Sequence, residues 1–204
     1  MSGNVAAHLG LMLVTDDRLL AGRDLVDVCR EAVQGGVTCV QLRLKLAPPR
    51  ELVTIARALI GAVRVPVLVN DRLDVALAAG AAGVHLGPDD VPVALARRIV
   101  PADFWIGASV GNEGEAELGR GADYWGVGPW RETTTKTEAG PALGPEGFRA
   151  IQALSRGIPC VAIGGIRPED GAAVLEAGGA GVAVVSGILG VTDVAQSARR
   201  YRSP

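Results

Sequence analysis

Aromatic, cysteine and histidine residues are scarce in this sequence. Aromatics make up 3% of the 204 residues although 49% are hydrophobic, so a core must be built from Val, Ile, Leu and Ala. Such side chains suit parallel strands that are buried on both faces. The three cysteines, Cys29, Cys39 and Cys160, are odd in number and lie in apolar stretches. This favours buried thiols in a reducing cytoplasm over a disulfide or a metal site.

Blocks of like charge and long apolar runs are also absent. With 20 basic and 22 acidic residues the net charge is −2, so nucleic acid is not expected as a partner. No apolar run reaches the length needed to cross a bilayer, so no membrane partner is expected. The first residues, MSGNVAAHLG, have neither a basic start nor a long apolar stretch, which predicts a cytoplasmic protein without a signal peptide. The composition leaves a homo-oligomer open.

Glycine, by contrast, is abundant, and short apolar runs recur along the chain. The 28 glycines fit a fold with many tight connections. Apolar runs typical of strands lie at 9–14, 37–42, 66–69, 83–86, 105–109, 123–128, 159–164 and 181–186. Helical patterns follow them at 24–35, 49–62, 72–79, 90–99, 112–120, 145–155, 168–177 and 192–201. Strands that alternate with helices predict a parallel sheet.

Eight such units favour a single (β/α)8 domain, a TIM barrel, over residues 1–204. The alternative is a doubly wound open sheet, which usually carries a G-x-G-x-x-G turn after its first strand. Here the first strand ends in VTDDR, without glycine. In a barrel the chemistry lies in the loops at the carboxyl ends of the strands, so candidate site residues are expected there.

Polar side chains end the second strand. Gln41, Arg43 and Lys45 alternate with two leucines, so the three polar groups point to one side. An arginine fork and a mobile lysine charge both match phosphate oxygens. The segment therefore predicts a site for a polyanion. The alternative is a solvated strand end that forms ion pairs with helices.

Acidic residues follow the third and fourth strands. Asn70 and Asp71 end the third strand, and Asp89 and Asp90 come shortly after the fourth. Neighbouring strands lie about 5 Å apart, so Asp71 and Asp90 can come close together. Two close carboxylates require a proton or a cation, and oxygen ligands beside phosphates favour Mg²⁺. The alternative is that Asp89 or Asp90 only caps the next helix.

The connection after the sixth strand is long, polar and rich in glycine. It covers 128–144, and loops of this length without secondary structure are usually functional. Residues 133–136 supply three threonine hydroxyls and the cation of Lys136. We therefore expect a mobile lid that brings Lys136 to a phosphate. The alternative is a disordered surface loop.

The seventh and eighth strands end in small residues. Gly164 and Gly165 follow one strand, and Ser186 and Gly187 follow the other. The loops after these two strands form the usual phosphate site of a TIM barrel, because glycine lets backbone amides approach the oxygens. Ser109, at the end of the fifth strand, can bind phosphate or cap a helix.

Groups for acid-base or nucleophilic chemistry are missing. His85 lies within the fourth strand, where packing is the favoured interpretation, and the other histidine is His8. No Ser-His-Asp set, Cys-His pair or Cys/His metal cluster is evident. The site is therefore predicted to be electrostatic, made of cations, a metal and amides, with no obvious general base.

Taken together, the motifs resemble the thiamine phosphate synthase family, in that family's order: QLRLK, VNDRLDVALAAGAAGVHLGPDD, IGAS, ADYWGVGP, TTTK, VAIGGI and GVAVVSGI. They cover residues 11–189. The resemblance implies a (β/α)8 barrel that joins the diphosphate of hydroxymethylpyrimidine to thiazole phosphate and releases pyrophosphate, with Mg²⁺ as cofactor.

The resemblance also implies roles for individual residues. The family's diphosphate-binding residues are matched by Gln41, Arg43, Lys45, Asn70, Ser109 and Lys136. Its Mg²⁺ ligands are matched by Asp71 and Asp90, and its contacts to thiazole phosphate by Thr133, Thr135, Gly165, Val185 and Ser186. The catalytic cations would be Arg43, Lys45 and Lys136, which stabilise the departing pyrophosphate.

Several positions depart from the family pattern. Leu44 stands where an acidic residue is usual, Pro88 where glutamine is usual and Gly111 where histidine is usual. A tyrosine common early in the first strand is replaced by Leu11 and Met12. These departures concern the pyrimidine pocket and leave the phosphate and metal groups in place.

Three rival functions are compatible with the same fold. A thiazole tautomerase-type isomerase would keep the phosphate site of strands 7 and 8 but needs a proton-transfer group, which Gly111 does not offer. A non-catalytic phosphate-binding barrel would need no metal. Another phosphosugar enzyme should show a clearer acid-base residue.

Overall fold

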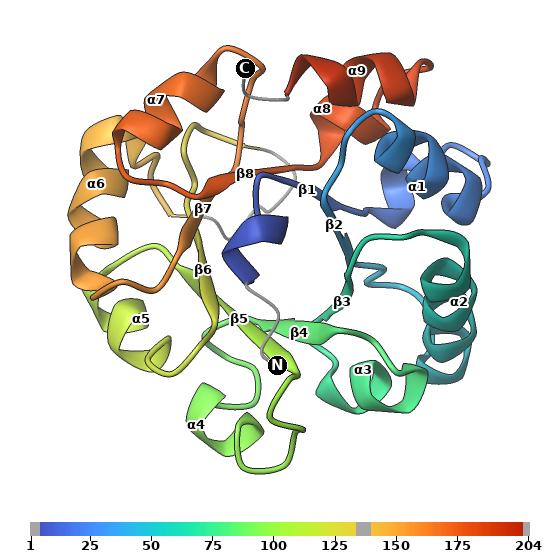
Figure 1. Cartoon of the computed structure of the whole chain (residues 1–204), viewed down its shortest axis with the longest axis horizontal. Helices are drawn as coiled ribbons and strands as arrows, with labels where there is room; N and C mark the ends of the chain where they lie inside the picture. Colours follow the sequence, from blue (N-terminus) through green and yellow to red (C-terminus); the bar gives the residue numbers. More distant parts are fainter. Residues whose placement is uncertain (1–4, 134–139, 202–204) are drawn as a thin grey trace.

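The predicted strands form a closed parallel barrel. The computed structural model describes residues 5–133 and 140–201. Each strand pairs with the next and β8 pairs with β1, which closes the sheet (Figure 1). The strands are β1 (Leu11–Val14), β2 (Cys39–Leu42), β3 (Val67–Asn70), β4 (Gly83–Leu86), β5 (Trp105–Val110), β6 (Tyr124–Val127), β7 (Cys160–Ile163) and β8 (Gly181–Val184). The predicted (β/α)8 fold class is confirmed.

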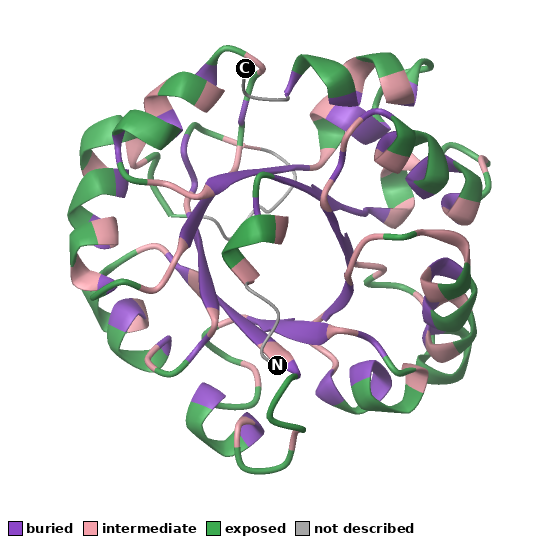
Figure 2. Cartoon of the chain, in the orientation of Figure 1, coloured by how far each residue is buried: buried purple, intermediate pink, exposed green. Residues whose placement is uncertain are grey.

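Helices form a ring outside the barrel (Figure 1). They are α1 (Leu25–Gln34), α2 (Pro49–Ala62), α3 (Leu73–Ala79), α4 (Val93–Ala96), α5 (Glu113–Leu118), α6 (Gly144–Leu154), α7 (Asp170–Glu176), α8 (Ser186–Leu189) and α9 (Val194–Arg200). Two short 3₁₀ helices are η1 (Val5–His8) and η2 (Asp17–Leu19). Figure 2 shows that buried residues of the ring face the strands and exposed residues face outward.

Side-chain caps fix where several helices begin. Asp24 caps α1, Asn112 caps α5 and Asp193 caps α9, each accepting a hydrogen bond from the backbone N–H three residues further on. Such caps satisfy amides that the helix itself leaves unpaired. Because α1 and α5 come after β1 and β5 in the chain, the caps of these two helices also hold connections at the carboxyl end of the barrel.

The core has one layer outside the barrel and one inside. In β1, Leu11 and Leu13 pack outward against the helices, whereas Met12 and Val14 pack inside the barrel. This division follows from the alternation of side chains along a strand. Val5 of η1 packs against the inner cluster, so the amino-terminal end of the barrel is covered. A functional site is therefore expected at the carboxyl end of the barrel.

Most predicted elements differ from the observed ones by one or two residues at an end, and for two of them the structure shows a clear reason. The helix predicted over 90–99 is limited to α4, which starts after Pro92 and is followed by turns closed by i→i−3 hydrogen bonds. The strand predicted over 181–186 stops at Val184, because Val185 has φ −112° and ψ −88°. Helix α8, which the sequence did not predict, begins at the next residue.

The three cysteines are buried free thiols, as expected. Burial raises the pKa of Cys29 and Cys39 to about 12 and that of Cys160 to about 11. Thiols with such pKa values stay protonated near neutral pH and are poor nucleophiles. Within residues 5–133 and 140–201, no helix combines the length and apolar character that a membrane span requires.

Candidate active site

A cavity of about 570 Å³ opens at the carboxyl ends of the strands. Every strand contributes to its lining, through Val14, Gln41, Asn70, His85, Ser109, Gly126, Ile163 and Val184. This is the end of a TIM barrel where catalytic residues are found. The predicted site residues can therefore be judged by whether they border this cavity.

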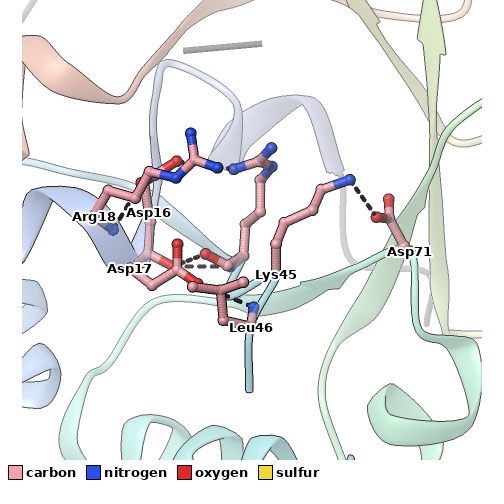
Figure 3. Close-up of polar contacts among 8 residues, drawn as sticks. Asp16, Asp17, Arg18, Lys45, Leu46 and Asp71 are labelled. Carbon is pink, nitrogen blue, oxygen red and sulfur yellow. Dashed lines mark hydrogen bonds and ion pairs between the residues drawn. The ribbon is translucent and has the colours of Figure 1, made fainter. Parts of the chain in front are cut away.

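The polar end of β2 forms one wall of the cavity. Gln41, Arg43 and Lys45 all border it. The side chain of Arg43 donates to Asp16 at 2.9 Å. The Lys45 ammonium lies 3.3 Å from the Asp71 carboxylate (Figure 3). Ion pairs are thus present, but their carboxylates belong to strand ends and connections rather than to helices. The wall can present two cations to an anion.

Asp71 and Asp90 lie next to each other beside β3 and β4. Asp71 has a left-handed φ of 63°, held by a hydrogen bond from its N–H to the His85 carbonyl at 2.8 Å. Such strained residues cluster at functional sites. Burial raises the pKa of Asp90; the Gly87 amide opposes the shift, and the Asp71 carboxylate adds to it. The two carboxylates therefore repel each other.

Asp90 does not cap the following helix. Its Oδ2 accepts the Gly87 N–H at 2.7 Å, and α4 begins without any side-chain cap. The alternative reading of Asp89 and Asp90 as helix caps is therefore wrong. Asp89 borders the cavity instead.

A metal ion at this site would have few protein ligands. No group of three or more His, Cys, Asp or Glu side chains that could hold a metal occurs within 5–133 and 140–201. Asp71 borders the cavity, whereas Asp90 is not part of its lining and lies behind it, beside Asp71 and on the Gly87 amide. Mg²⁺ is commonly bound by one or two carboxylates together with water and substrate phosphates. The donor set fits that ion.

His85 does more than pack, and sequence reasoning missed this. Its Nε2 lies 3.0 Å from the Ser109 hydroxyl and its Nδ1 lies 2.9 Å from the Tyr124 hydroxyl. Burial raises the pKa of Tyr124, while a hydrogen bond with the Gln41 side chain acts in the opposite direction. A buried polar chain thus connects the predicted residues Gln41 and Ser109 across the barrel.

Gly107 allows this chain to form. It is paired with His85 on one side and with Tyr124 on the other. A Cβ on Gly107 would lie 2.3 Å from the Tyr124 ring, so a side chain there would block the contact. The sequence could not predict this contact, because it depends on the strand register that pairs Gly107 with His85 and Tyr124, and a single sequence does not reveal register.

The long connection after β6 is described in part. Thr133 borders the cavity, whereas Thr135 and Lys136 lie outside the described residues. The stem of the connection is tied to β7: the Trp130 N–H donates to the Ile163 carbonyl at 2.8 Å. The Arg131 side chain pairs with Asp170, which is buried.

Gly164 and Gly165 border the cavity in left-handed conformations, with φ of 91° and 67°. Packing supplies a second reason for glycine here. A Cβ on Gly164 would lie 2.7 Å from the Pro129 Cβ, and one on Gly165 would lie 2.7 Å from the Arg131 Cβ. The lack of a side chain at these two glycines therefore leaves room for the stem of the β6 connection, in addition to its expected role in phosphate binding.

Two groups of residues named from the sequence remain. One follows β8, and the other consists of positions that differ from the family pattern. Val185 and Ser186 border the cavity, and Ser186 is the first residue of α8. Pro88 and Gly111 also border it, whereas Leu44 packs against the outer core. A Cβ on Gly111 would lie 2.9 Å from the Gly128 carbonyl oxygen, so a larger residue there requires the backbone to move.

Comparison with known proteins identifies the family. The family description "Thiamine monophosphate synthase" matches residues 11–188. A thiamine-phosphate synthase of Azorhizobium caulinodans is 48% identical over 201 residues, which cover 96% of this chain and 94% of that protein. The structure of a thiamine phosphate pyrophosphorylase from Pyrococcus furiosus superposes with a TM-score of 0.87 at 40% identity, covering 97% and 96% of the two chains. A 3-hexulose-6-phosphate synthase at 18% identity, with a TM-score of 0.72, shares the fold alone. With near-complete coverage at such identity, the chain belongs to the thiamine monophosphate synthase family.

Proposed function

We propose that the chain condenses 4-amino-2-methyl-5-hydroxymethylpyrimidine diphosphate with thiazole phosphate to give thiamine phosphate and pyrophosphate. The observation that carries this proposal is that one cavity has two regions suited to anions. Arg43 and Lys45 border it just after β2, and Gly165 and Ser186 border it after β7 and β8. Two phosphorylated substrates suit such a cavity.

The proposed reaction breaks one bond and forms another. The C–O bond between the pyrimidine methylene carbon and the diphosphate breaks, and its electron pair leaves with pyrophosphate. The electron-rich aminopyrimidine supports the positive methylene carbon. The thiazole nitrogen then donates its lone pair to form the C–N bond. No protein base is needed, in keeping with a site whose histidine, His85, lies between two hydroxyls.

The site residues are assigned by substrate. We assign the diphosphate to Gln41, Arg43, Lys45, Asn70, Ser109 and Lys136. We assign thiazole phosphate to Thr133, Thr135, Gly165, Val185 and Ser186. Arg43, Lys45 and Lys136 act as catalytic cations, because negative charge on the pyrophosphate grows as the C–O bond breaks. Holding both substrates in one cavity lowers the entropic part of the barrier.

Asp71 and Asp90 are the proposed ligands of Mg²⁺. Burial raises the pKa of Asp90 and repulsion from the Asp71 carboxylate adds to the shift; both are electrostatic costs that a bound cation relieves. When bound, the ion supplies positive charge to the departing pyrophosphate. Lys45, 3.3 Å from Asp71, joins the carboxylate pair to the cationic wall.

Direct assay tests the proposed function. The chain is mixed with both substrates and Mg²⁺, and we expect thiamine phosphate and pyrophosphate in equal amounts. Conversion of a thiazole isomer without consumption of the pyrimidine would instead identify a tautomerase-type isomerase. Binding of phosphate ligands without turnover would identify a non-catalytic barrel.

Removal of the metal tests the Mg²⁺ assignment separately. In the same assay with EDTA, product formation should stop, and it should return when excess Mg²⁺ is added. Full turnover in EDTA would contradict the assignment of Asp71 and Asp90.

We also infer the cytoplasm as the place of action. Cys29, Cys39 and Cys160 are free thiols in the structure, and such thiols persist in a reducing compartment.

A further inference from the structure

The guanidinium of Arg43 is held by a carboxylate that lies behind it. Asp16, which follows β1, accepts a hydrogen bond from Arg43 Nη1 to its Oδ2 at 2.9 Å. The exposed fraction of the side chain is 7% for Asp16 and 17% for Arg43. Arg43 borders the cavity. The pair therefore ties a cation at the cavity to a buried anchor.

Neighbouring contacts hold both partners of this pair. The other carboxylate oxygen of Asp16 accepts the Arg18 N–H at 2.9 Å and caps η2. Thr15, which is fully buried, accepts the Arg43 N–H at 2.8 Å and donates to the Arg43 carbonyl at 3.2 Å. The end of β1 thus fixes the backbone and the side chain of Arg43 together.

We propose that Asp16 is a positioning residue that holds the Arg43 guanidinium in the orientation needed for the departing pyrophosphate. This rests on the proposed function. A guanidinium has five N–H donors in a planar fork, so one carboxylate oxygen on Nη1 leaves donors for an anion. A donor that is already oriented need not reorganise as charge develops. Loss of the Asp16 carboxylate should therefore lower kcat.

Asp16 also has an opposite effect on binding. Its negative charge partly neutralises Arg43, which weakens the attraction of the site for a diphosphate in the ground state. Removing that charge should leave pyrophosphate binding unchanged or tighter, while the loss of orientation lowers kcat. General damage to the fold would weaken both. A lower kcat with unchanged or tighter pyrophosphate binding therefore indicates positioning, whereas a loss of both indicates a merely structural role.

The test compares two neighbouring carboxylates. Asp16→Asn keeps a side chain that can cap η2 but removes the charge facing Arg43. Asp17→Asn is the matched control, because this substitution removes the same charge one residue further along the chain. The Asp17 carboxylate accepts the Leu46 N–H at 3.0 Å (Figure 3). For each full-length variant, kcat and KM for the pyrimidine diphosphate are measured with Mg²⁺, and the Kd of inorganic pyrophosphate is measured by calorimetry.

In Asp16→Asn, kcat should fall roughly tenfold to a hundredfold, the cost of a misplaced catalytic contact. The Kd of pyrophosphate should stay the same or decrease. In Asp17→Asn, all three values should stay within about twofold of the unaltered chain. A kcat of Asp16→Asn within twofold of normal, or a Kd that rises as kcat falls, would overturn the proposal.

A double-mutant cycle checks that Asp16 acts through Arg43. In an Arg43→Ala background, Asp16→Asn should change kcat by less than about twofold, and a further large loss would show that it acts elsewhere. If melting curves show that Asp16→Asn does not fold, Asp16→Ser takes its place, because serine caps but is too short to reach Arg43. An unaltered chain that forms no product contradicts the proposed function itself, whereas an active chain insensitive to Asp16→Asn contradicts the role of Asp16 alone.

Discussion

Two of the chain's 20 basic residues are lysines, Lys45 and Lys136, and the others are arginines. Arginine serves in structural contacts: Arg97 pairs with Asp123, and Arg120 donates to a backbone carbonyl. Its planar fork suits such fixed geometry. Both lysines belong to the proposed diphosphate site, where a compact charge on a flexible stem can follow an oxygen as the C–O bond lengthens. Arg43 is assigned to the same site, where its planar fork is held in a fixed position by Asp16.

Lys136→Ala should lower kcat about a hundredfold, equivalent to about 3 kcal/mol, and change KM much less. The reason is that a cation near the departing pyrophosphate interacts more strongly with the transition state than with the bound substrate. Steady-state kinetics of the variant, with Lys136→Arg as the charge-preserving control, provide the measurement. A rise in KM at constant kcat would mean that Lys136 only aids binding, and changes within twofold would mean a solvated loop residue.

Among the elements, the short helix α8 and the stem of the β6 connection complete the cavity. Helix α8 places Ser186 at its first position, beside the cavity. The first turn of a helix has N–H groups without intrahelical partners, and these groups favour anions. The stem reaches Gly164 through the Arg131 N–H, at 2.9 Å. Both elements lie on the side of the cavity assigned to thiazole phosphate.

Ser186→Asp should weaken the binding of thiazole phosphate about tenfold or more, because a carboxylate at the start of α8 repels the phosphate. The pyrimidine diphosphate, whose proposed contacts do not include Ser186, should be affected much less. Calorimetric titration of each ligand measures the difference, and Ser186→Ala controls for loss of the hydroxyl. Equal weakening of both ligands would mean that the two substrates are assigned to the wrong regions.

Asp170→Asn should destabilise the chain near neutral pH by releasing the stem of the β6 connection. Burial acts to raise the Asp170 pKa, but hydrogen bonds from Arg131 and from the Arg167 N–H outweigh it, so the folded-state pKa is lowered. A lowered carboxyl pKa contributes stability that is present above the unfolded-state pKa, about 3.9, and is lost as pH falls through the folded value.

The melting temperature of Asp170→Asn should therefore lie a few degrees below that of the unaltered chain at pH 7. The gap should narrow as the pH falls below 4. Thermal melts over this pH range measure it. A gap that stays constant with pH would show that the ionised form of Asp170 is not what stabilises the stem.

In the whole molecule, the two ends of the barrel have separate tasks. The amino-terminal end is closed by η1 and by an inner cluster that includes Leu9, Met12 and Leu68. The carboxyl end holds the cavity and most of the charged residues discussed above. This division is general in TIM barrels, where the amino-terminal face contributes stability and the carboxyl face contributes chemistry.

Leu9→Ala should therefore reduce stability without reducing catalysis. Leu9 is fully buried, and truncating a buried leucine costs about 2–5 kcal/mol. Below its melting temperature the variant should keep kcat within about twofold. Leu95, which is 51% exposed on α4, provides the control, since Leu95→Ala should change stability by less than about 0.5 kcal/mol. A large loss of kcat in folded Leu9→Ala would contradict the separation of the two ends.

The sequence by itself determined the barrel, because its information lies in local patterns. Strand composition and helical periodicity are properties of neighbouring residues, so the range 49–62 matches α2 and GVHL matches β4. Alternation along β2 likewise predicted that Gln41, Arg43 and Lys45 share a face, and all three border the cavity. Chain order was sufficient for each of these conclusions.

Only the tertiary structure decided which side chains meet. Asp16 and Arg43 are 27 residues apart in the chain, and His85 and Tyr124 are 39 apart. Such pairs depend on strand register and on the absence of a side chain at Gly107, neither of which has a local signature. The end of β8 at Val184 and the start of α8 were missed for a related reason: a short apolar run reads as strand or helix until its neighbours fix the backbone. Closure of the sheet is what converts residues distant in sequence into one site.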